Sequence, residues 1–178
     1  MSTTLPTAVA TAPPSVPRWV DRAAHAVPLV VLPSGLWRMA MAVGIPVGFS
    51  GQLAADWRPG WETSSYITLL TLFTEALALL TLGLVRPWGE KVPRWVPLLA
   101  DRRVPPWAAA APALLGALAV TAVTLLMFRG GWPASAGGPE GPEGGAAWIM
   151  NACYVPMLLW GPLLATVAIA YALRRRNT

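Results

Sequence analysis

The stretch SYITLLTLFTEALALLTLGLV (Ser65–Val85) is long and apolar, and a single charge, Glu75, stands at its centre. The stretch before it, LVVLPSGLWRMAMAVGIPVGF (Leu29–Phe49), carries Arg38 near its midpoint. A helix of about 20 apolar residues covers the roughly 30 Å of hydrocarbon in a bilayer. The two stretches therefore predict membrane-spanning helices that each hold one charge at mid-depth.

Two further apolar stretches, Trp107–Phe128 and Trp148–Tyr171, have the same character. Together the four predict an all-α integral membrane protein, a four-transmembrane-helix bundle whose membrane domain covers residues 18–173. Residues 1–17 are rich in Thr, Ala, Pro and Ser, which is typical of a disordered tail. Residues 174–178 predict a short basic tail at the C-terminus.

The first predicted span is the least regular of the four. Proline and glycine interrupt it at Pro33, Gly35, Gly44, Pro46 and Gly48. We expect kinks there, with neighbouring helices satisfying the freed carbonyl groups. The segment Arg18–Val27 predicts a short interfacial helix that leads into this span.

The composition excludes several classes of protein. Of 178 residues, 55% are hydrophobic and only 12% are charged, whereas a soluble domain carries about 25% charged residues. The net charge of +5 does not indicate nucleic-acid binding, because the basic residues flank apolar stretches. The lone Cys153 excludes an intramolecular disulfide, and the lone His25 excludes bis-histidine haem ligation by one chain. We expect no metal and no cofactor.

Basic residues divide unequally between the two predicted sides. Ten Lys and Arg residues flank the spans on the side of the termini, against only Arg58 and Arg129 on the other side. By the positive-inside rule both termini are predicted to be cytoplasmic, in the inner (cytoplasmic) membrane. The outer connector over residues 129–147 is rich in Gly and Pro and predicts a flexible link. The inner connector over residues 86–106 alternates Trp, Pro and Arg and is predicted to lie on the headgroup surface.

Arg38 and Glu75 form the first candidate site. A charge at the bilayer centre costs at least about 2.5–3.5 kcal/mol, so such residues face the interior and find a partner. In an antiparallel hairpin the two would lie at the same depth and serve as counter-ions. The pair is interpreted either as a structural lock or as a site in which Arg38 binds an anion and Glu75 acts as counter-ion or proton donor.

The polar residues of the second span share one helical face. Ser64, Thr68, Thr71 and Glu75 are spaced four, three and four residues apart. This face either lines a polar path to the carboxylate or holds helices together through local hydrogen bonds.

Trp37 and Trp160 lie near the middle of their spans, unlike most of the ten tryptophans, which fall at span ends as an aromatic belt. Turned inward, both indoles would wall a mid-depth pocket and stabilise a cation; otherwise they pack or face lipid. Nearer the outer surface, another set could converge: Asp56, Glu62, Tyr66, Asn151 and Tyr154. The predicted ligand-binding residues are Arg38, Glu75, Trp37, Trp160, Thr71 and Thr68.

Three runs carry a resemblance to known proteins: LPSGLWRMA at residues 32–40, EALALLTLGLVRPWGEKVPRWVP at 75–97, and RRVPP followed by APALLGALAVT within 102–121. They resemble a group of small polytopic membrane proteins of high-GC Gram-positive bacteria. The resemblance implies a membrane protein and brings no activity and no site.

Two function hypotheses follow. In the first, the chain is a non-enzymatic module that binds a lipid-like or amphiphilic ligand, or a partner membrane protein, around Arg38 and Glu75. Membrane lipids, and a second copy or another membrane protein, are then its expected partners. In the second, it is a small membrane-embedded enzyme, an acid-initiated cyclase or isomerase of an isoprenoid-like substrate. There Glu75 donates the proton and Trp37 and Trp160 stabilise the cation. The sequence leaves open which is right.

Overall fold

The computed structural model describes residues 16–86, 105–131 and 138–176, and all regular structure in these ranges is helical. Residues 1–15 of the predicted tail and residues 87–104 of the predicted inner connector lie outside the described residues. The elements are, in order, α1 (Arg18–Ala42), α2 (Gly51–Asp56), α3 (Trp61–Leu80), η1 (Thr81–Leu84), α4 (Pro106–Arg129), η3 (Gly138–Glu140), α5 (Gly144–Tyr154), η4 (Val155–Leu159) and α6 (Trp160–Arg176).

Three helical stretches are long and apolar enough to cross a membrane: Trp61–Leu84, Pro106–Arg129 and Gly144–Arg176. They cover the second, third and fourth predicted spans, and they indicate a membrane protein. The last stretch continues through Arg174, Arg175 and Arg176, residues that we expected in a tail, so these arginines form the final turn of α6.

The first predicted span, Leu29–Phe49, does not match a helix. α1 begins at Arg18 and ends at Ala42, so it absorbs the predicted interfacial helix and stops short of Phe49. Gly44 and Gly48 have φ values of +86° and +94°, a left-handed conformation that ends a helix. Pro28 and Pro33, in contrast, are accommodated inside α1.

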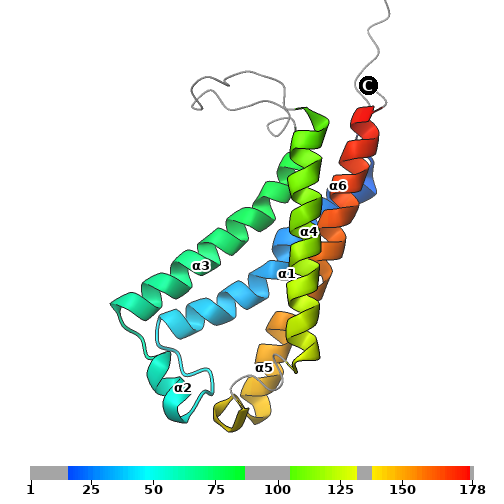
Figure 1. Cartoon of the computed structure of the whole chain (residues 1–178). Coiled ribbons are helices and arrows are strands. Elements are labelled where there is room, and N and C mark those ends of the chain that lie inside the picture. Colours follow the sequence, from blue (N-terminus) through cyan, green and yellow to red (C-terminus); the bar gives the residue numbers. More distant parts are fainter. Residues whose placement is uncertain (1–15, 87–104, 132–137, 177–178) are drawn as a thin grey trace, which may run out of the picture.

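The long helices form two pairs (Figure 1). α4 and α6 run side by side and make the most extensive contact, followed by α1 against α3 and α1 against α6. The start of α1, the end of η1 and the end of α6 gather at one end of the molecule. The pairs diverge toward the other end, where α2 and α5 lie.

Buried side chains form three clusters along this axis. At the gathered end, residues from α1, η1, α4 and α6 pack together: Val20, Ala24, Leu84, Val85, Ala110, Val167, Ala168 and Tyr171. The middle cluster joins α1, α3 and α6 through Val27, Val31, Ala78 and Trp160. At the other end Trp37 packs on Met150. Large apolar side chains on the outer faces stay exposed, such as Leu69 at 67% and Leu115 at 68%, as expected for surfaces that meet lipid.

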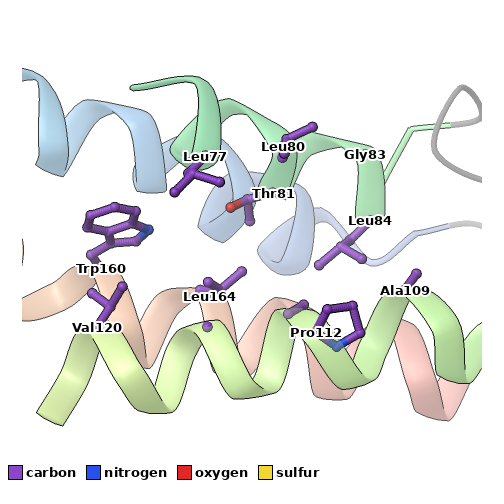
Figure 2. Close-up of a pocket in the computed structure, with 12 residues that line it drawn as sticks. Leu77, Leu80, Thr81, Gly83, Leu84, Ala109, Pro112, Val120, Trp160 and Leu164 are labelled. Carbon is purple, nitrogen blue, oxygen red and sulfur yellow. The ribbon is translucent and has the colours of Figure 1, made fainter. Parts of the chain in front are cut away.

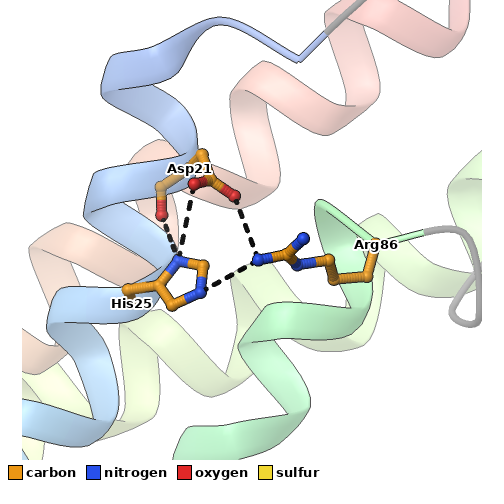
Figure 3. A network of polar contacts seen from close by, with 3 residues as sticks. All are labelled: Asp21, His25 and Arg86. Atoms are coloured by element: carbon orange, nitrogen blue, oxygen red, sulfur yellow. Dashed lines mark hydrogen bonds and ion pairs between the residues drawn. The ribbon is translucent and has the colours of Figure 1, made fainter.

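A polar cluster joins α1 to Arg86, two residues after η1 (Figure 3). The Arg86 Nη2 group lies 3.2 Å from His25 Nε2 and 3.9 Å from an Asp21 carboxylate oxygen. A guanidinium only donates hydrogen bonds, so Nε2 is the acceptor and Nδ1 carries the imidazole proton. Nδ1 then donates to the Asp21 backbone oxygen at 2.7 Å.

The connector after α1 and the connector after α4 are docked on each other. The Leu53 N–H donates to Glu140 Oε2 at 2.9 Å, and the Ser50 N–H donates to the Glu140 backbone oxygen at 2.9 Å. Gly51 has a φ of +56°, and a β-carbon there would overlap the Glu140 carboxylate. The described part of the connector that we predicted to be flexible therefore caps α2 and fixes its position.

Candidate functional site

The polar face of α3 lies against α1. Near one end, Ser64 Oγ donates to the Ala42 carbonyl at 2.8 Å and so satisfies a carbonyl of the last turn of α1. Farther along the same interface, Arg38 of α1 donates a hydrogen bond to Thr71 of α3. Thr68, the remaining hydroxyl on this face, is half-buried and has no hydrogen bond to another described residue.

Arg38 is held from two sides. Its Nε donates to Thr71 Oγ1 at 3.2 Å, and Thr71 itself is only 5% exposed. The Tyr154 hydroxyl, from the last turn of α5, interacts with the same guanidinium. The Nη2 atom of Arg38 is buried and, within the described part of the chain, has no hydrogen-bond partner.

Glu75 occupies a space that a glycine leaves open. A β-carbon at Gly35 of α1 would come within 2.9 Å of Glu75 Oε1 and 3.2 Å of a Thr71 methyl group. The Oε1 atom is buried and finds no hydrogen-bond donor among the described residues. A carboxylate oxygen without a donor is costly in a low-dielectric interior.

The expected ion pair between Arg38 and Glu75 does not form. In the described ranges, the contact within 4.0 Å between opposite charges joins Arg86 to Asp21. The physical reason is that Arg38 reaches Thr71 and Tyr154 instead, while Glu75 turns toward Gly35. Arg38 remains close enough to attract the carboxylate electrostatically. The donor Arg38 Nη2 and the acceptor Glu75 Oε1 are therefore both left without hydrogen-bond partners among the described residues.

Trp37 and Trp160 do not wall a common pocket. Trp37 packs with Met150 at the α5 end, and Trp160 packs with Val27, Val31 and Ala78 in the middle cluster. Both indoles are buried, at 7% and 6% exposure, so each packs inside the protein instead of facing lipid. Each lines a different cavity.

The cavity beside Arg38 has a volume of about 290 Å³. Its polar members are Arg38, Tyr66 and Tyr154, and the remaining walls are apolar: Trp37, Met41, Phe49, Leu53, Trp57, Ile67 and Leu70. An apolar cavity with a few convergent polar groups is typical of a small-molecule site.

Of the residues expected to converge near the outer ends of the spans, Tyr66 and Tyr154 do meet in this cavity. Asn151 instead donates to the Ala147 carbonyl of its own helix, and Asp56 accepts a bond from Gln52. Sequence reasoning missed Phe49, Leu53 and Trp57, which reach the cavity because the connector after α1 folds back. No local pattern signals that fold-back apart from the glycines at 44 and 48.

No group of three or more His, Cys, Asp or Glu side chains is placed to hold a metal ion in the part of the chain that the structure describes. No family model matches the chain, and no curated protein or solved structure matches it either. The resemblance to small membrane proteins of high-GC Gram-positive bacteria stays a prediction.

Proposed function

We propose that the chain crosses the cytoplasmic membrane four times, with both termini on the cytoplasmic side. Three crossings are the stretches that have the length and composition of spans. α1 supplies the fourth: it is paired along its length with α3, and its 25 residues would extend about 37 Å. The excess of Lys and Arg at the termini supports the orientation.

Within that frame, we propose that the protein binds an amphiphilic, lipid-like molecule in the cavity beside Arg38. Arg38 and Tyr154 would donate hydrogen bonds to an oxygen-bearing head group, and the aromatic and aliphatic walls would cover the apolar body. Arg suits this role because its guanidinium offers several donors in a fixed plane.

One observation carries the proposal: Arg38 Nη2 is buried without a hydrogen-bond partner in the described chain, and Arg38 lines the cavity. Inside a membrane such atoms are satisfied by protein, by trapped water or by a ligand. A ligand in this cavity would therefore lie beside the Arg38 guanidinium.

The geometry offers no support for the cyclase or isomerase hypothesis. That mechanism needs Glu75, Trp37 and Trp160 around one substrate. The two tryptophans line separate cavities, and Glu75 is among the lining residues of neither. We therefore propose a binding protein and no reaction.

Native mass spectrometry of the purified full-length chain tests this proposal. The wild type should retain a co-purified amphiphile, and Arg38→Gln should reduce the bound fraction strongly because the main donor is lost. Arg129→Gln, which changes an exposed arginine at the end of α4, is the matched control and should retain it. Equal occupancy in the wild type and Arg38→Gln would contradict the proposal.

A further inference from the structure

A second cavity lies farther along α3, toward the end of the molecule where α1 begins and α6 ends (Figure 2). Its volume is about 390 Å³, and its walls come from the end of α3, η1, α4 and α6. Leucine side chains, Pro112 and small residues of α4 form most of the lining. Arg38, Tyr154 and the other residues of the first site do not line it.

Two polar atoms interrupt this apolar lining. Trp160 and Thr81 are 6% and 2% exposed, and both point into the cavity. Trp160 Nε1 and Thr81 Oγ1 are buried and have no hydrogen-bond partner among the described residues. An indole N–H only donates, and a threonine hydroxyl has one hydrogen to donate.

The buried Thr81 hydroxyl is unpartnered among the described residues, unlike the hydroxyls of several other threonines. Several other threonines bond to carbonyls of their own helix four residues earlier, among them Thr74, Thr121, Thr124 and Thr166, at 2.6–2.8 Å. Thr81 begins η1, where the 3₁₀ turn replaces α-helical geometry. Its hydroxyl makes no such bond and is left for another partner.

The cavity is accessible from the lipid. Leu77 and Leu80 on its α3 side are 42% and 58% exposed. Among the described elements, α3 packs on α1 and η1 rather than on α4, so no described helix closes the side between α3 and α4. A membrane-resident molecule can therefore enter sideways without passing through water.

We infer that this cavity binds an apolar molecule that carries a carbonyl oxygen, as a second site separate from the one proposed beside Arg38. A carbonyl has two acceptor lone pairs and no hydrogen to donate, which matches two free donors. The Trp160 Nε1–H and the Thr81 hydroxyl both bond to that oxygen, and the aliphatic walls cover the chain. A plain hydrocarbon would fill the space and leave both donors unsatisfied.

The experiment compares two probes of equal chain length, methyl pentadecyl ketone and heptadecane, added to the full-length protein in one detergent. Ligand binding to the folded state raises the unfolding temperature, and the shift against probe concentration gives an apparent Kd. Two hydrogen bonds predict that the ketone binds about 10- to 30-fold more tightly than the alkane.

Conservative variants test whether the preference for the ketone over the alkane depends on the Trp160 and Thr81 donors. Trp160→Phe and Thr81→Val should each reduce the ketone preference several-fold while heptadecane binding persists. Trp107→Phe and Thr166→Val change exposed residues outside the cavity and should keep the wild-type ratio. A wild type that binds both probes equally overturns the inference, even if a variant fails to fold, and so does an unchanged ratio in both donor variants.

The source of the carbonyl is identified from the protein purified out of cell membranes. An ester lipid and a prenylated quinone both present a carbonyl on an apolar body and are separated by mass after organic extraction. Either molecule, retained by the wild type and depleted in the Trp160→Phe, Thr81→Val double variant, supports the site. Equal amounts in both proteins contradict it. The ratio of the two probes does not depend on Arg38, so this site and the first one succeed or fail separately.

Discussion

Thr71 determines where the Arg38 side chain lies, because its hydroxyl accepts the Nε–H at 3.2 Å in a buried position. Thr71→Val keeps the shape and removes the acceptor, so a charged donor is left buried and unpaired. We expect a loss of about 1–3 kcal/mol in the free energy of unfolding, measured in mixed micelles. Thr68→Val, on the same face without such a bond, is the control and should change stability little.

Gly35 determines where Glu75 lies. Gly35→Ala places a methyl group within 2.9 Å of Oε1, so the flexible Glu75 carboxylate must shift, and the net loss of stability should stay below about 1 kcal/mol because alanine favours the helix. Glu75→Ala in the same chain removes the displaced group. A double-mutant cycle should therefore show a coupling above about 0.5 kcal/mol, and additive effects would contradict the contact.

At this scale the sequence predicted which face of α3 carries chemistry, because a spacing of four, three and four residues defines a helical face. It did not predict the partner of Arg38. A flexible guanidinium selects among Thr71, Tyr154 and Glu75, and two of these acceptors lie within one helical turn of each other. The space opposite Glu75 depends on Gly35, which the sequence analysis interpreted only as a source of kinks.

Among the elements, α4 and α6 depend on close approach at Gly161. A β-carbon there would overlap Thr121 Oγ1 and lie 2.9 Å from the Ala117 carbonyl oxygen. Gly161→Ala should separate the helices and lower the unfolding temperature clearly. Gly116→Ala, where a β-carbon meets nothing within 4 Å, should be neutral or slightly stabilising because alanine favours helices by up to about 1 kcal/mol. Similar effects from both would contradict this account of the interface.

The docking of α2 depends on the charge of Glu140. Backbone N–H groups of Leu53 and Gln52 donate to the carboxylate and hold the pKa of Glu140 below its usual value. The folded-state pKa is lowered, so the stabilisation is complete above the ordinary carboxyl pKa and is lost as pH falls through the folded-state pKa. Hydrogen exchange at the Leu53 amide should accelerate over that acidic range, beyond its intrinsic pH dependence.

Two variants check this pH dependence. Glu140→Gln should show the faster Leu53 exchange already at neutral pH, because a neutral amide is a weaker acceptor. Glu143→Gln is the control and should behave as the wild type. Protection of Leu53 that is unchanged in Glu140→Gln would show that the carboxylate does not hold α2.

The sequence predicted three long helices near their observed bounds because hydropathy summed over 20 residues is a strong signal. It misplaced the first helix, since the apolar run continues through residues 43–49 although the backbone there leaves the helix. Gly44 and Gly48, both with positive φ, follow the end of α1 at Ala42. Hydropathy carries no information about backbone conformation, so it does not predict where this helix ends. The docking of Glu140 joins residues 87 positions apart, and a local pattern cannot reveal it.

For the whole molecule, the number of crossings is the decisive quantity, because four place both termini on one side and three place them on opposite sides. In a Cys153→Ala background, Arg58→Cys should react with an impermeant maleimide in intact spheroplasts. Ser2→Cys and Thr178→Cys should react only after permeabilisation. Reaction of one terminus alone in intact spheroplasts would show that α1 does not cross.

The divergence of the α1–α3 pair from the α4–α6 pair gives the protein a tapered outline. A tapered body that spans a bilayer excludes more area from one leaflet than from the other. Each inserted copy therefore displaces more lipid from one leaflet than from the other. The protein should accumulate in membrane whose curvature already compensates for that difference.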